Sequence, residues 1–330
     1  EIDLFGRLRR ATEASQAELL STEEARRALV LSLAATVANS YISLRDLDNE
    51  LEISRRTLTT REEALRIFEL RYQGGVVSEM ELSQVRSEVE TARVAVPTLE
   101  QGVAQQENAL SFLLGRLPGP IARGKTLAEM SLPLPPVSLP SSVLERRPDI
   151  RQAEQILVSS NARIGVAKAA YFPVVTLTGL LGSSSVALSS LFSGPARVWS
   201  YGADAVLPIF TAGAIAGQVQ AAEARQVQAL QQYRKTVENA FREVDDALIG
   251  GIKTSEIVDA RIRQVEALNA YDRSARLRYE GGYSAYLEVL DAERNLFQAQ
   301  INESQARAQA LIAATTLYKV LGGGWQAASR

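Results

Sequence analysis

An internal duplication is the feature of this sequence that most limits how the chain can fold. The run LRYQGG at 70–75 recurs as LRYEGG at 277–282, which is an offset of 207 residues. The same offset pairs other residues without a gap: Gly6 with Gly213, Val37 with Val244, Leu110 with Leu317, and Leu114–Gly115 with Leu321–Gly322. Two copies of one unit, at about 1–115 and 208–322, are therefore expected to form the same structure twice.

Each copy carries the seven-residue period of long helices. In the first copy, two apolar seams keep this spacing: Val30, Val37, Leu44, Leu51, Leu58, Leu65 and Tyr72, then Leu82, Val89, Val96, Val103, Leu110 and Leu117. The period predicts helices that pack as a left-handed coiled coil. A helix over 8–72 would be about 95 Å long and one over 78–115 about 55 Å, with a kink at Pro97. In the second copy the inner seam becomes alanine, at 292, 299, 306 and 313, which lets helices approach closely.

The segment between the two copies is rich in proline and leads into a further helix. Gly115 to Pro140 contains six prolines, which predicts an extended connector. Ser142 followed by Glu145 has the spacing of a capping box that opens a short helix. Pro148 suits the first turn of a longer helix, which is expected to stop before Pro173.

A period of two follows that helix. Apolar residues alternate along 175–181 and 199–207, on either side of a serine-rich loop. Alternation over about ten residues is what a strand of a membrane β-barrel requires, and Trp199 and Tyr201 suit the aromatic girdle at a membrane interface. A half-buried hairpin of a soluble domain gives the same alternation, so the pattern alone leaves both interpretations open.

If the hairpin lies in a membrane, its strand edges need further strands to pair with. A lone hairpin is marginally stable, and lipid does not tolerate unpaired strand edges. The second copy is preceded by about 67 residues, 141–207, that have no counterpart before Glu1. We expect an equivalent N-terminal segment to be missing, together with any signal sequence. Two hairpins per chain would close a barrel only by sharing it with other subunits, so oligomerisation is expected.

Composition excludes several classes of function. The chain has no Cys, no His and a formal net charge of −2. Zinc, copper and iron sites therefore lack their usual nitrogen and sulfur ligands, and catalytic triads that use His or Cys are excluded. The near-neutral charge gives no electrostatic footprint for nucleic acid. No stretch approaches 18 uninterrupted apolar residues, so no transmembrane helix is predicted. We expect no enzymatic activity, no cofactor and no metal site.

Five segments are distinctive in combination. They are EIDLFGR at 1–7, LERRPDI at 144–150, NARIG at 161–165, Phe172–Pro173, and the stretch from RYEGG to LDAER over 278–294. Together they resemble the outer membrane efflux proteins, a family of TolC-like channels. The resemblance extends over essentially the whole chain. It is nearest to the drug- and metal-efflux branch that works with inner-membrane resistance–nodulation–division pumps.

The resemblance implies a fold, an assembly and a location. The fold is mainly α, with long antiparallel coiled-coil helices that form an α-barrel in a homotrimer, plus a β-hairpin that contributes to a membrane β-barrel. Three subunits would make twelve strands in the outer membrane of a Gram-negative bacterium and a twelve-helix tunnel in the periplasm. The partners would be outer membrane lipid, a periplasmic adaptor (membrane fusion) protein and the inner-membrane pump. Family members are usually lipoproteins anchored through an N-terminal Cys.

Under this resemblance the chain divides into six segments. They are a first helical hairpin at 1–115, a proline-rich equatorial connector at 116–147, a helix leading to the barrel at 148–173, the membrane hairpin at 174–210, a second helical hairpin at 211–322 and a tail at 323–330. The expected function is a passive exit duct for small molecules, gated at the periplasmic tip and driven by the pump through the adaptor.

The resemblance also assigns a gate. Leu287 would form an apolar ring, Asp291 an acidic ring about one turn deeper, and Arg294 would pair across helices or subunits to hold the tip shut. The spacing places all three on one helix face. The residues alone favour another interpretation, in which Leu287 is coiled-coil core and the two charges form an ordinary surface pair. The first copy has Met80, Gln84 and Ser87 at the matching positions.

Two glycine turns would dock the adaptor. They are Gly74, Gly75 and Val76 in the first copy, and Gly281, Gly282 and Tyr283 in the second. Glycine at these positions also fits simple termination of a helix in the left-handed region, and the two roles are compatible.

Two other classes of function are open to the sequence. The run GPIARGKT at 119–126 fits the phosphate-loop pattern, but that pattern works only between a buried strand and a helix. Here it follows a helix and leads into prolines, so an ATPase is disfavoured. A soluble periplasmic coiled-coil scaffold or adaptor is the main alternative to a channel. The duplication and the amphipathic strands argue against it.

Overall fold

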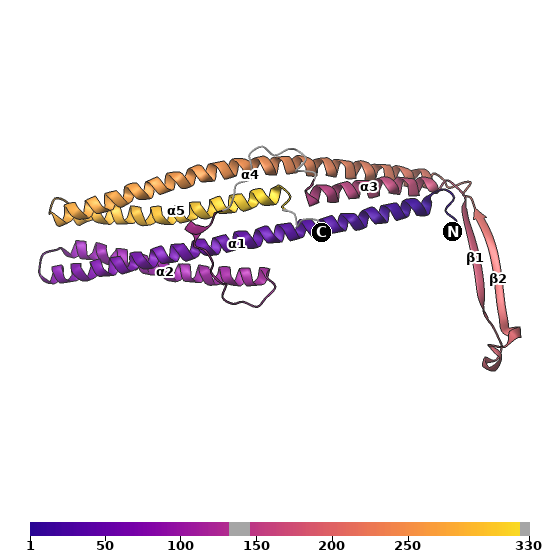
Figure 1. Ribbon diagram of the computed structural model, residues 1–330, viewed down its shortest axis with the longest axis horizontal. Coiled ribbons are helices and arrows are strands. Elements are labelled where there is room, and N and C mark those ends of the chain that lie inside the picture. The colour runs from indigo at the N-terminus through magenta and orange to yellow at the C-terminus, as the bar shows by residue number, and fades with distance from the viewer. Residues whose placement is uncertain (132–145, 324–330) are drawn as a thin grey trace. The chain divides into compact units, whose positions relative to one another are not determined.

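The fold is mainly helical, with one small antiparallel sheet among the described residues (Figure 1). The computed structural model describes residues 1–131 and 146–323. The prolines expected to extend the connector at 133–140, the pair Ser142 and Glu145, and the tail from 324 onward lie outside the described residues. The chain divides into two compact units, Glu1–Ala28 with Leu144–Ala240 and Leu29–Val143 with Phe241–Arg330.

Two long helical hairpins have the same dimensions. The first consists of α1 (Arg7–Gln73) and α2 (Glu79–Leu113), and the second of α4 (Ala214–Glu280) and α5 (Tyr286–Val320). Adding 207 to each bound of the first hairpin gives the bounds of the second. The glycines with positive φ keep the same offset: Gly6 and Gly213, Gly75 and Gly282, Gly115 and Gly322.

The turn of each hairpin is closed by the same backbone hydrogen bonds. Val76 N donates to the carbonyl oxygen of Arg71 at 2.9 Å, and Tyr283 N donates to that of Arg278 at 2.8 Å. Such bonds satisfy carbonyls that the end of a helix leaves without a partner. They require a left-handed residue just past the helix, which glycine supplies without strain. The proline expected to kink α2, Pro97, lies inside the continuous helix.

Apolar side chains from both hairpins form the main core of the second unit. One cluster joins all four long helices near the turns: Phe68, Leu82, Val85, Ala275, Tyr286, Val289, Leu290 and Ala292. Further along, residues 116–131 form a strap that crosses the helices. Its Leu127, in the short 3-10 helix η1 (Leu127–Glu129), packs with Ile42 of α1 and Ala308 of α5. The strap therefore ties one hairpin to the other.

The seven-residue seams are buried along only part of their length. Leu44, Val89 and Leu110 are fully buried, as expected of seam residues. Val30, on α1, is instead 57% exposed, and Leu117, at 88% exposed, lies beyond the end of α2. The period is a property of the sequence, but burial needs a facing surface, and one chain does not supply it along the whole seam.

The first unit combines three helical segments with the sheet. α3 (Pro148–Ala169) has proline in its first turn and ends before Pro173, as predicted. β1 (Val174–Ser183) and β2 (Arg197–Val206) pair antiparallel along their whole length, so that the first residue of each strand lies opposite the last residue of the other. The loop between them contains two short 3-10 helices, η3 (Leu188–Ser190) and η4 (Gly194–Ala196). Every residue of β2 is exposed, so this strand is covered on neither face.

One helix among the described residues, α1, is long and apolar enough to cross a membrane by length and composition alone. The stretch that qualifies includes polar residues, which is why the sequence has no uninterrupted apolar run. Length and composition are weak grounds, because core helices of soluble proteins and signal sequences pass the same test.

Candidate functional site

The first turns of α5 have two different faces. Tyr286, Val289 and Leu290 are buried in the cluster that joins the two hairpins. Leu287 is 55% exposed, and Asp291 is exposed beside it. Within one chain Leu287 is therefore not a core residue, which was the alternative interpretation of this leucine. The helix period separates the two sets, because residues three or four apart share a face.

Arg294 pairs across helices rather than with its neighbour on α5. Its Nε donates to Oε1 of Glu88, on α2, at 2.7 Å, and its Nη2 donates to the same oxygen. This hydrogen bond raises the pKa of Arg294. Glu88 is also bonded to Arg61 of α1, whose Nη1 lies 3.1 Å from its Oε2. Glu88 and Arg61 are buried, so the three charges form a bridge from α1 through α2 to α5.

Asp291 takes different partners. Its Oδ2 accepts a hydrogen bond from Asn295 Nδ2 at 3.1 Å and a longer one from the Tyr271 hydroxyl at 3.4 Å. Burial and the nearby charge of Asp291 raise the pKa of Tyr271. The surface pair of Asp291 with Arg294 considered from the sequence is not formed; the arginine joins the hairpins while the aspartate stays exposed.

An aromatic group packs behind the exposed face of α5. The ring of Tyr286 lies 4.3 Å from that of Phe68, and 5.1 Å from that of Tyr279, centroid to centroid. Arg71 donates from Nη1 to the Tyr279 hydroxyl at 2.8 Å, and its guanidinium carbon lies 5.8 Å from the ring centre. This contact links the end of α1 to the end of α4, so the two glycine turns are held by aromatic and cation–π contacts.

The glycine turns themselves present exposed apolar side chains. Val76 is 74% exposed and Tyr283 82% exposed. Gly75 and Gly282 have φ values of 68° and 73°, which disfavour any side chain. A Cβ on Gly281 would lie 2.8 Å from Cδ2 of Tyr283, so a side chain there would displace this exposed ring.

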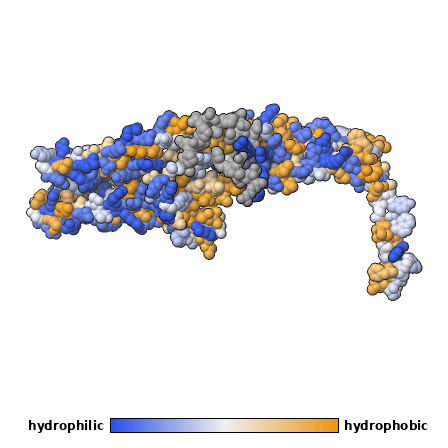
Figure 2. Space-filling model, viewed as in Figure 1, coloured by the Kyte–Doolittle hydropathy of each residue, from blue (hydrophilic) through white to orange (hydrophobic). Residues whose placement is uncertain are grey.

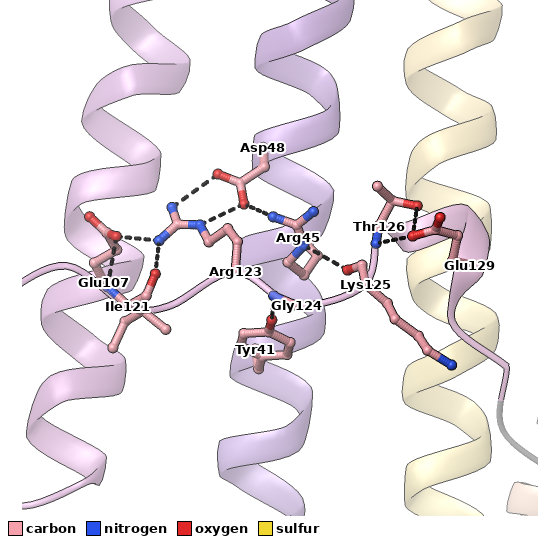
Figure 3. Close-up of polar contacts among 10 residues, drawn as sticks. All are labelled: Tyr41, Arg45, Asp48, Glu107, Ile121, Arg123, Gly124, Lys125, Thr126 and Glu129. Atoms are coloured by element: carbon pink, nitrogen blue, oxygen red, sulfur yellow. Dashed lines mark hydrogen bonds and ion pairs between the residues drawn. The ribbon is translucent and has the colours of Figure 1, made fainter.

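The residues of the phosphate-loop pattern hold the strap against α1 and α2 (Figure 3). Arg123 donates to both carboxylate oxygens of Asp48, at 2.9 and 3.0 Å, and to Glu107. The amide of Gly124 donates to the Tyr41 hydroxyl at 2.8 Å. The run is followed only by the three-residue η1, not by a helix whose N-terminus could hold a phosphate. Its arginine clamps the strap to α1 and α2.

Comparison with known proteins places the chain in a family. The model of a family described as Outer membrane efflux protein matches residues 1–116 and 139–323. The chain belongs to the outer membrane efflux proteins.

Relatives in this family are similar over nearly the whole chain. The probable efflux pump outer membrane protein TtgC of Pseudomonas putida is 39% identical over 326 residues, which are 98% of this chain and 67% of TtgC. The cation efflux system protein CusC of Escherichia coli is 36% identical over 328 residues, 99% of this chain and 71% of CusC. The crystal structure of the open state of the MtrE outer membrane channel of Neisseria gonorrhoeae has a TM-score of 0.88 at 34% identity, and the match covers 98% of this chain and 73% of that one.

The hairpin of this efflux protein carries the aromatic residues expected at a membrane interface. Trp199 and Tyr201 stack with their centroids 5.7 Å apart and are 70% and 83% exposed. On β1, Leu177 and Leu181 are 62% and 85% exposed. Figure 2 shows mostly apolar and weakly polar residues on this side of the hairpin. Such a surface is costly in water and suits a lipid environment.

Sequence reasoning missed the residues that hold the candidate gate. Glu88, Arg61 and the Arg71–Tyr279 contact carry no local pattern, because each joins residues from different helices. The one available signal was the repeated tyrosine, Tyr72 and Tyr279, beside the glycine turns.

Proposed function

We propose that this chain is a subunit of an outer membrane efflux channel, a passive duct through which small molecules leave the cell. Its family supports a channel, because the relatives are efflux proteins of the outer membrane. The observation that carries the proposal is the hairpin of β1 and β2. It exposes Leu181, Trp199 and Tyr201, and the described chain partly covers only the first three residues of β1.

The hairpin also supports an assembly. Apart from the bridge of Ile2 to Val175, the edges of the two strands are open, and lipid provides no hydrogen-bond partner for them. Strands from further copies of the chain would close these edges, and three copies are the assembly that the resemblance implies. The matching bounds of the two helical hairpins support an internal duplication, in which each copy adds one hairpin to a common tunnel in the periplasm.

The gate in this proposal lies on the exposed face of α5. Leu287 and Asp291 point away from the core of their own chain, so they are free to line a pore shared with other copies. Arg294 holds α5 against α2 through Glu88. Opening would require α5 to move away from α2, which breaks this ion pair.

The two turns would dock a periplasmic adaptor that connects the channel to an inner-membrane pump. Val76 and Tyr283 offer exposed apolar contacts on rigid glycine turns. We expect Val76→Asp and Tyr283→Asp to weaken adaptor binding without changing conductance in a bilayer. A pull-down with the adaptor, run beside the conductance measurement, separates docking from gating.

Single-channel recording of the full-length protein in planar lipid bilayers tests the function. A water-filled bore gives discrete conductance steps, whereas a soluble scaffold or adaptor gives none. Asp291→Ala and Arg294→Ala should each raise the conductance by loosening the tip. The matched positions of the first copy provide the controls, since Gln84→Ala and Ser87→Ala should leave the conductance unchanged. Unchanged conductance in both α5 variants would refute the gate while leaving the channel in place.

A further inference from the structure

A small cleft lies in the second unit, where α1 meets both helices of the second hairpin. It has a volume of about 110 Å³. Five charged side chains contribute to its wall: Arg56 and Arg61 from α1, Asp272 and Arg276 from α4, and Glu293 from α5. This is an unusual lining for the interior of a coiled coil, whose seams are normally apolar.

Two buried polar atoms in this wall have no partner. They are Nε of Arg61 and Oδ1 of Asp272. The rest of each group is used: Arg61 Nη1 donates to the carbonyl oxygen of Glu88 at 2.9 Å, and Asp272 Oδ2 accepts from Arg276 Nε at 3.0 Å. The Arg61 side chain is only 6% exposed, so bulk water does not reach it freely. Folded proteins rarely leave buried donors and acceptors without a partner.

The chemistry of the wall selects the occupant. Among the buried side-chain atoms of the wall, one donor and one acceptor lack a partner, so an occupant that reaches both has to accept and donate at once. An anion would face the carboxylates of Asp272 and Glu293, and a metal cation would face three guanidinium groups, those of Arg56, Arg61 and Arg276. Water meets neither repulsion, and the cleft is large enough for more than one molecule.

We propose that this cleft is a hydration site, in which ordered water connects Arg61 Nε to Asp272 Oδ1 and makes the contact of α1 with the second hairpin a polar joint. Arg276 bonds both carboxylates of the wall: its Nε donates to Asp272 Oδ2, and its Nη2 donates to Glu293 Oε1 at 2.6 Å. Neither bond uses Asp272 Oδ1, which stays available to water. The joint differs from the apolar cluster around Phe68 and Tyr286, which excludes water from the same pair of hairpins.

The joint has a physical use. Helices that part at an apolar cluster expose hydrocarbon to water, whereas helices that part at a hydrated ion cluster exchange one set of hydrogen bonds for another. The joint therefore lowers the resistance of α1 to separation from α4 and α5. Its use in opening a gate rests on the proposed function; the hydration itself does not.

A crystal structure of the intact protein at high resolution tests the occupant directly. We expect density for water within hydrogen-bond distance of both Arg61 Nε and Asp272 Oδ1. A dry cleft would overturn the proposal. So would an anomalous peak at this position after a bromide soak, because it would show an anion site instead.

Replacing four charged residues of the cleft without changing the net charge tests whether the polar joint weakens the contact between the helices. The variant R61M/D272L/R276M/E293L fills the cleft with apolar side chains and leaves Glu88 paired with Arg294. Because buried ion clusters are commonly less stabilising than apolar residues of similar volume, we expect Tm to rise by several degrees. The control R242Q/D246N/K253Q/E256Q removes two exposed pairs of α4 and should leave Tm unchanged. A Tm of the cleft variant at or below that of the wild type would contradict the joint. Neither experiment depends on conductance, so the joint and the channel can fail separately.

Discussion

The two helical hairpins have the same bounds and turns, yet they differ at the residues that fix them. α2 begins with a capping box, in which Ser78 Oγ accepts from Glu81 N and the Glu81 carboxylate accepts from Ser78 N. α5 begins at Tyr286, and its N-cap residue, Ala285, supplies no side-chain cap. The candidate gate lies on α5. Under the proposed function, the capped first hairpin would be the fixed one and the second the one that moves.

Buried charge follows the same division. In the first hairpin Arg61 and Glu88 are buried and paired. The offset of 207 places Leu268 and Asn295 at the matching positions of the second hairpin. One backbone thus accepts an ion pair in one copy and uncharged residues in the other. Glu88 of this pair also accepts a hydrogen bond from Arg294, so the second hairpin is held by a carboxylate that is buried in the first.

The largest expected effect comes from breaking this anchor. Glu88→Ala would leave Arg61 buried without its partner, and we expect a loss of about 3–5 kcal/mol in the free energy of unfolding. The matched substitution in the second hairpin, Asn295→Ala, should change stability by less than about 0.5 kcal/mol because its site is exposed. Chemical denaturation followed by circular dichroism measures both.

The double variant R61L/E88N sharpens this result, since it gives the first hairpin the residues of the second. It should recover most of the stability that Glu88→Ala loses. If the double variant were as unstable as the single one, the loss would come from packing around Glu88 rather than from the unpaired arginine.

A smaller effect is expected from exchanging the caps. Ser78→Ala should destabilise α2 by about 1 kcal/mol, because an amide at the helix start loses its acceptor. Ala285→Ser should stabilise α5 by a similar amount, since Glu288 already stands three residues later and completes a capping box. Thermal unfolding of the two variants should therefore shift in opposite directions. Equal shifts of one sign would remove the distinction between a capped and an uncapped hairpin.

The smallest effect concerns two carboxyl groups of α1 that face α5. Burial raises the pKa of Asp46 and of Glu50 above their ordinary values of 3.8 and 4.5. Their partners are neutral: Ser304 Oγ donates to Asp46 at 2.5 Å and Gln305 Nε2 donates to Glu50 at 2.8 Å. A raised pKa means that the folded state binds the proton more tightly than the unfolded state. This contribution to stability is present below the ordinary values and is lost as pH rises through the raised ones.

D46N/E50Q should therefore be more stable than the wild type near neutral pH, and the difference should shrink as pH falls through the raised pKa values and vanish below the ordinary ones. Denaturation curves at a series of pH values measure this difference. Glu107 is a control of opposite sign, because the hydrogen bond from Arg123 lowers its pKa. Glu107→Gln should therefore be less stable than the wild type near neutral pH, and this difference should disappear only as pH falls through the lowered pKa. A stability difference that does not change with pH would show that Asp46 and Glu50 are not desolvated.

Local features of the chain were predictable because their causes are local. The left-handed glycines at 75 and 282 end the helices they follow, and Pro148 starts α3 in its first turn. The alternation before and after the serine-rich loop predicted two paired strands. The exposed face of α5 that contains Leu287 and Asp291 also follows from helical spacing alone.

What the sequence by itself determined is the length of each helix, the place of each turn and the doubling of the hairpin, since these depend on neighbouring residues and on a period. Only the tertiary structure decided that Arg294 pairs with Glu88, that Arg123 clamps the strap and that Asp46 is buried beside Ser304. These partners are between 75 and 258 residues apart. A seven-residue period specifies which side of a helix is apolar, but the partner of a polar side chain depends on which helix the fold places opposite.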